Sequence, residues 1–63
     1  MSRIMTIAVD AWRLRETARQ ALASGEFDRA VALSVEAQKS QATPAGEALR
    51  QLSEWLWVRS MVV

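Results

Sequence analysis

An aromatic residue and two arginines lie at helical spacing in the first third of the chain, at Trp12, Arg15 and Arg19. Since these positions are three and four residues apart, a helix would place them on one face. Two guanidinium groups beside an indole ring suit a carboxylate, an acidic peptide or a phosphate-bearing partner, because arginine binds such groups through paired hydrogen bonds and tryptophan supplies contact area. The alternative is a solvated surface, with Asp10 and Glu16 as local ion-pair partners and Trp12 in the core. This alternative is favoured, because a charged helix face usually faces water.

A second candidate for binding is the apolar C-terminal segment, residues 55–63. Counted at about 3.6 residues per turn, Trp57 lies roughly 160–200° from the apolar stripe of the helix that contains it, so it cannot share the same core. The second apolar surface expected here consists of Trp57, Met61, Val62 and Val63. Exposed apolar patches usually mark a contact with a protein or a membrane, and a membrane-surface helix would need more flanking cations than Arg59. The alternative is that this tail folds back over the first helix, where Ile4, Met5 and Val9 offer a complementary ridge.

The residue types needed for catalysis are scarce. The chain has no histidine and no cysteine, which removes imidazole bases, thiol nucleophiles and zinc sites. Glu47 and Glu54 lie seven residues apart, but nothing in the sequence builds a pocket around them. There is no glycine-rich phosphate loop and no metal-ligand spacing. We therefore predict a protein that is not an enzyme and that carries no cofactor and no metal.

Charge is evenly distributed along the chain. Eight basic and seven acidic residues give a net charge of +1, and the two signs are interleaved. Nucleic-acid binding usually needs a concentrated basic face, so this pattern disfavours it. The alternative function is a small DNA-binding helix-turn-helix regulator in which Arg13, Arg15 and Arg19 contact phosphates. No apolar run approaches the ~20 residues of a membrane span, and the expected compartment is the cytoplasm.

The chain is short for a stable isolated domain. It has 63 residues, and 11 of its apolar positions are alanine, so few side chains can fill a core. For a unit of this size, the free energy of apolar burial and the cost of chain ordering nearly cancel. Disulfides and structural metals are the usual remedy, and this sequence offers neither. We therefore expect a homo-oligomer or a subunit that is stabilised by another chain.

The apolar spacing predicts three helices, over residues 6–23, 27–41 and 44–58, followed by an apolar tail at 59–63. Gly25 ends the first helix, since glycine enters the left-handed conformation without steric cost. Pro44 suits the first position of the third helix, with Thr43 as its N-cap. The core stripe predicted for the third helix comprises Ala45, Ala48, Leu49, Leu52, Trp55, Leu56 and Arg59. The fold class expected is therefore all-α, with three helices in one domain.

The joint between the first two helices carries a more specific spacing. Small, turn and aromatic residues recur at Ala18, Gly25, Phe27, Ala30 and Ala37. Over residues 11–44 this spacing resembles the tetratricopeptide repeat, a helical hairpin of about 34 residues, as a single imperfect copy. The resemblance implies that the first helix lines a concave, ligand-facing surface. The family's ligand-facing positions fall on Trp12, Arg15, Arg19, Leu22 and Ala23.

A single repeat of this kind needs a neighbour. About three stacked repeats normally bury a continuous core, and this chain has one. The third helix could cap the hairpin, or copies of the chain could stack on one another. We therefore expect a non-catalytic protein–protein interaction module or small accessory subunit. It would self-associate or dock a larger partner through the apolar C-terminal helix, where Trp57, Met61 and Val62 are the residues expected for association. An acidic partner would bind Trp12, Arg15 and Arg19.

Overall fold

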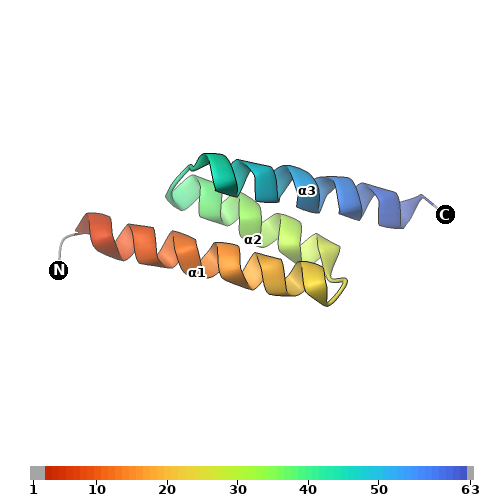
Figure 1. Cartoon of the computed structure of the whole chain (residues 1–63), viewed down its shortest axis with the longest axis horizontal. Coiled ribbons are helices and arrows are strands. Elements are labelled where there is room, and N and C mark those ends of the chain that lie inside the picture. The colour runs from red at the N-terminus through yellow and green to blue at the C-terminus, as the bar shows by residue number, and fades with distance from the viewer. Residues whose placement is uncertain (1–2, 63) are drawn as a thin grey trace.

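The all-α prediction is confirmed. A computed structural model describes the backbone of residues 3–62 and the side chains of residues 8–62, and these residues form three successive helices (Figure 1). The helices are α1 (Arg3–Ala23), α2 (Phe27–Ser40) and α3 (Pro44–Met61). α1 begins before the predicted residue 6, and α3 continues past the predicted residue 58. Most of the predicted tail at 59–63 is therefore helical.

The turn between α1 and α2 is built around one glycine. Gly25 has a φ of 76°, in the left-handed region that side chains with a Cβ disfavour. Its N–H donates to the carbonyl of Leu22 at 3.1 Å, and the N–H of Glu26 donates to the carbonyl of Ala21 at 2.8 Å. This pair of hydrogen bonds is the Schellman motif, which satisfies the last carbonyls of a helix. The sequence-based prediction that the helix ends at Gly25 is confirmed.

The connection between α2 and α3, like the turn before α2, depends on a few neighbouring residues. The Thr43 hydroxyl accepts a hydrogen bond from the Gly46 N–H at 2.9 Å, and Pro44 occupies the first helical position. Both features were predicted from the residue types. The backbone N–H of Thr43 also donates to the Gln38 side-chain oxygen at 3.2 Å. This second contact ties the start of α3 to the last turns of α2.

The core consists almost entirely of small side chains. Its buried residues are Ala11, Ala18, Ala21, Ala30, Ser34, Ala37, Gly46, Leu49 and Ser53. The largest side chains that are fully buried are Ser34 and Ser53, whose hydroxyls donate to the carbonyls of Val31 at 2.9 Å and Leu49 at 2.8 Å. Because these hydroxyls are satisfied within their own helices, the serines act as small spacers that let helices approach closely.

The three helices form an elongated body with α2 as the shared neighbour. α2 packs against both α1 and α3, whereas α1 and α3 touch at few points. The body extends over 48 × 19 × 13 Å, and its radius of gyration of 12.1 Å exceeds the ~10.6 Å expected of a compact chain of this length. The start of α1 and the end of α3 lie at opposite ends of the long axis (Figure 1). The tail therefore does not fold back over the first helix.

Candidate functional site

Two large apolar side chains of α3 that were predicted to lie in the core are on the surface. Leu52 is 48% exposed and Trp55 is 54% exposed. The prediction for these residues was wrong, as it was for Ala45 and Ala48, which are also exposed. The buried residues of α3 are instead the smaller set Gly46, Leu49 and Ser53. Since the buried side chains of α2 are alanines and a serine, α2 and α3 pack too closely to admit a leucine and a tryptophan between them.

Five exposed residues on one side of α3, together with the C-cap residue Val62, form a seam along the helix. Its members recur at alternating spacings of three and four residues: Ala45, Ala48, Leu52, Trp55, Arg59 and Val62. All six are exposed, and we call this set the outer seam. A repeat of seven residues with apolar first and fourth positions is the pattern by which one helix pairs with another in a coiled coil. The Arg59 guanidinium lies 4.6 Å from the centre of the Trp55 ring, so it stacks on that ring.

The residues predicted for association separate into two places. Val62 belongs to the outer seam, and it is 76% exposed. Trp57 and Met61 lie on a different side of α3, by helical counting, and Trp57 is only 37% exposed. Since Met61 and Val62 are both exposed, neither packs against the described part of α1. Of the residues that the alternative prediction placed beneath the tail, Val9 is exposed, and the side chains of Ile4 and Met5 lie outside the described residues.

The predicted site on α1 is present as a surface, but its charges have partners. Trp12 is 57% exposed, so the alternative that placed it in the core is wrong. Arg19 forms an ion pair with Glu16, as that same alternative predicted. The Arg15 guanidinium donates to the Gln41 carbonyl at 3.5 Å, at the C-terminal end of α2, where a cation is favourable. We call Trp12, Arg15 and Arg19 together the α1 face.

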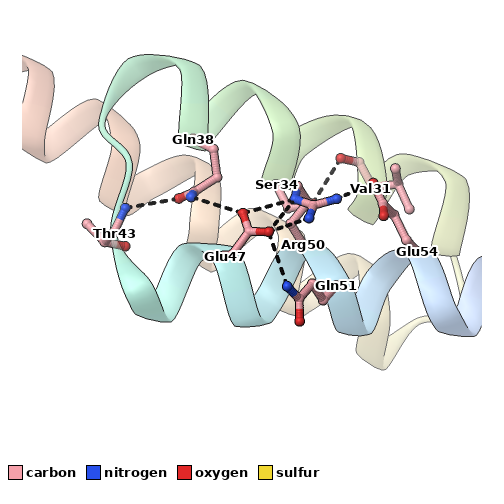
Figure 2. Close-up of polar contacts among 8 residues, drawn as sticks. All are labelled: Val31, Ser34, Gln38, Thr43, Glu47, Arg50, Gln51 and Glu54. Atoms are coloured by element: carbon pink, nitrogen blue, oxygen red, sulfur yellow. Dashed lines mark hydrogen bonds and ion pairs between the residues drawn. The ribbon is translucent and has the colours of Figure 1, made fainter.

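A polar network that the sequence analysis missed joins α3 to α2 (Figure 2). At its centre, Arg50 donates to Glu47 through its Nε at 3.0 Å and approaches Glu54 at 2.6 Å. The Gln38 amide of α2 donates to Glu47 at 3.4 Å, while its oxygen accepts from Thr43. The spacing of Glu47, Arg50 and Glu54, three and four residues apart, was the signal available in the sequence. The two acids were considered there only as a catalytic pair.

The electrostatics of this network fit a structural role. Hydrogen bonds from Arg50 are the main reason that the pKa of Glu47 is lowered to about 2, with further hydrogen bonds from Gln51 and Gln38. Glu47 and Glu54 in turn raise the pKa of Arg50 above its usual value. At neutral pH, Glu47 is therefore a carboxylate already engaged by donors. A group in this state neither gives up a proton nor accepts one readily, which fits poorly with acid–base catalysis.

Other kinds of site are not found in the described part of the chain. No pocket and no group of metal-ligating side chains occur among residues 8–62. Within residues 3–62, no helix has both the length and the apolar character needed to cross a bilayer. The features that the structure does provide are the outer seam and the α1 face.

Comparison with known protein families, curated proteins and solved structures found no match to this chain. The resemblance to the tetratricopeptide repeat therefore continues to rest on residue spacing. Its three small positions, Ala18, Ala30 and Ala37, are buried. A three-helix fold accommodates that resemblance and equally accommodates a plain helical hairpin with a third helix.

Proposed function

We propose that this chain is a non-catalytic protein–protein interaction module or small accessory subunit that docks through the outer seam of α3. One observation carries the proposal: a seven-residue repeat whose middle positions, Leu52 and Trp55, are large, apolar and exposed. The partner class that fits such a seam is an amphipathic helix, which contributes its own apolar stripe.

The energetics of the seam favour a partner. Burying a leucine or a comparably large apolar side chain contributes about 1.5–3 kcal/mol, and tryptophan is the residue type most enriched among those that dominate binding energy. The alanines at the N-terminal half of the seam let a neighbouring backbone approach closely. Seam residues therefore provide both an anchor, at Leu52 and Trp55, and room for the partner, at Ala45 and Ala48.

The start of α3 is also tied to α2 before any partner binds. The Gln38 side chain of α2 donates to Glu47 and accepts from the Thr43 N–H. A surface on a fixed helix loses little conformational entropy when it binds, so more of the contact energy appears as affinity. We keep as a secondary proposal that the α1 face takes an acidic partner in a cytoplasmic setting. Such a partner would compete with Glu16 for Arg19 and with the Gln41 carbonyl for Arg15.

The proposal is tested by two matched lysine substitutions on α3. Leu52→Lys places a charge in the outer seam, whereas Met61→Lys places the same charge on another exposed side of the same helix. We expect Leu52→Lys to weaken any association of the chain, with itself or with proteins of its source lysate, by about 100-fold. Met61→Lys should change it less than about 3-fold. Equal effects of the two substitutions would show that the seam is not the docking surface.

A further inference from the structure

We propose that the occupant of the outer seam is a second copy of this chain, packed antiparallel about a two-fold axis that passes between Leu52 and Trp55. This inference rests on the proposed function, in which the seam docks a helix, and it names that helix as α3 of another copy. Three features of the seam support this occupant: the sizes of its side chains, its charge, and the surface that the chain leaves exposed.

The sizes of the seam residues run from small to large along α3. In an antiparallel pair the two seams meet in reverse order. Leu52 of one copy then faces Trp55 of the other, Ala48 faces Arg59, and Ala45 faces Val62. Each pair in the outer part of the seam joins a small side chain to a large one, which fills the space between two helices evenly. A parallel pair would instead set alanine against alanine at one end, leaving a gap, and Trp55 against Trp55 at the other.

The charge of the seam favours the same orientation. Arg59 is the single charged residue of the seam, and a parallel pair would bring two copies of it together where water is excluded, which is unfavourable. In the antiparallel pair the two Arg59 positions are about 16 Å apart along the helix axis. The flanking positions Gln51, Leu56 and Val58 carry no charge. A second copy brings the same uncharged flanking positions and is therefore compatible with this surface, whereas a partner helix with charged flanking positions gains no ion pairs from them.

The chain exposes more surface than is expected of a compact monomer of its mass. Its accessible surface is 4476 Å², against roughly 4,000 Å² expected of a compact monomer of 7.0 kDa. This excess over the whole surface is on the order of 400–500 Å², compared with ~600 Å² per partner in the smallest specific interfaces. Helix α3 has 18 residues and is therefore about 27 Å long; it carries five of the six seam positions, and the sixth, Val62, is its C-cap residue. Pairing leaves the contacts of α3 with α2 intact, because these use Gly46, Leu49 and Ser53.

Cysteine cross-linking tests the orientation directly, since the natural sequence contains no cysteine. Copies carrying Ala45→Cys are mixed with copies carrying Val62→Cys and treated with a short thiol-reactive cross-linker. We expect the mixture to cross-link efficiently, because positions 45 and 62 of the two copies are adjacent. Either variant alone should cross-link at least ~10-fold more slowly, since the two copies of position 45 would be about 26 Å apart. Equally rapid cross-linking of Ala45→Cys alone would overturn the antiparallel arrangement.

Sedimentation equilibrium of the unmodified chain separates failure of this inference from failure of the proposed function. We expect the unmodified chain to form dimers that dissociate on dilution. The Leu52→Lys variant should be monomeric, and an unchanged far-ultraviolet circular dichroism spectrum of this variant is the control for folding. A chain that stays monomeric at ~1 mM overturns the second copy as occupant. If that monomer still binds another protein and Leu52→Lys abolishes this binding, the proposed function stands. If Leu52→Lys affects neither self-association nor binding to another protein, the inference and the proposed function both fail.

A fluorescence measurement provides an independent readout of the same contact. In a variant with Trp12→Phe and Trp57→Phe, Trp55 is the remaining tryptophan. We expect its emission to shift to shorter wavelength as protein concentration rises, because pairing covers the ring. An emission maximum that stays constant while the sedimentation mass doubles would place the contact elsewhere and overturn the inference.

Discussion

The two most exposed tryptophans of this chain have nearly the same accessibility and very different surroundings. Trp12 on α1 is 57% exposed and Trp55 on α3 is 54% exposed. Beside Trp12 lie two arginines that are already bound, Arg19 to Glu16 and Arg15 to the Gln41 carbonyl. Trp55 lies instead in the outer seam, which is apolar except for Arg59, whose guanidinium stacks on the Trp55 ring. Exposure of an aromatic ring is therefore weak support for a docking surface. The residues around the ring decide whether the Trp12 surface or the Trp55 surface is the better candidate.

Within this comparison, the largest expected effect comes from removing the Trp55 ring. Trp55→Ala should weaken association at least ~30-fold, because a central tryptophan of an interface typically contributes 2 kcal/mol or more, whereas Trp12→Ala should change it less than ~3-fold. Sedimentation equilibrium over a concentration series measures both. If Trp12→Ala weakens association more than Trp55→Ala does, the docking surface is the α1 face and not the outer seam.

An intermediate effect is expected from acid, which acts on the network behind the seam. Because Arg50 lowers the pKa of Glu47 from 4.5 to about 2, the folded state holds the Glu47 proton less tightly than the unfolded state does. The stability from this group is therefore present above pH ~4.5 and is lost as the pH falls towards 2. Thermal melts between pH 6 and pH 2 should show a fall in melting temperature that is smaller in Glu47→Gln.

The matched control for this prediction is Glu36→Gln, an exposed glutamate of α2 that makes no ion pair among the described residues. It should melt with the same pH dependence as the unmodified chain. Equal pH profiles for the unmodified chain and Glu47→Gln would show that the network does not stabilise α3.

The smallest effect on stability is expected on the α1 face. Arg15→Ala combined with Arg19→Ala should lower the free energy of unfolding by no more than ~1 kcal/mol, because exposed ion pairs contribute little. The same variant should lose binding of an acidic peptide if this face takes one. Unchanged peptide binding would remove these arginines from any site. A gel shift that collapses between low and physiological salt in the unmodified chain would instead support the alternative of DNA binding.

Local features of the fold were predictable because each depends on a few neighbouring residues. Gly25 ends α1 wherever the helix packs, since its positive φ is a property of glycine itself. Thr43 and Pro44 start α3 by the same kind of local preference. The α1–α2 hairpin was also predictable, because Ala18, Ala30 and Ala37 leave each helix with a side on which another backbone can approach.

The candidate site was predicted only in part. Trp12, Arg15 and Arg19 share one face of α1 as their spacing requires, but the sequence did not show that α2 ends beside Arg15. Val62, a predicted association residue, lies in the seam, whereas Leu52 and Trp55 are predicted core residues that lie on the surface. A periodic apolar stripe identifies a helix face that seeks a partner. It does not say whether that partner lies in the same chain.

The amino-acid sequence by itself determined three helices, their ends and the small-residue hairpin, because helix capping and periodicity act within a few residues. Only the tertiary structure decided which side of α3 meets α2. That choice depends on the combined shape of two surfaces: except for Leu49, the buried residues of α2 and α3 are all small, and helices packed through them exclude Leu52 and Trp55. The rotation of one helix against another is set by this fit, and it turned the apolar stripe outward.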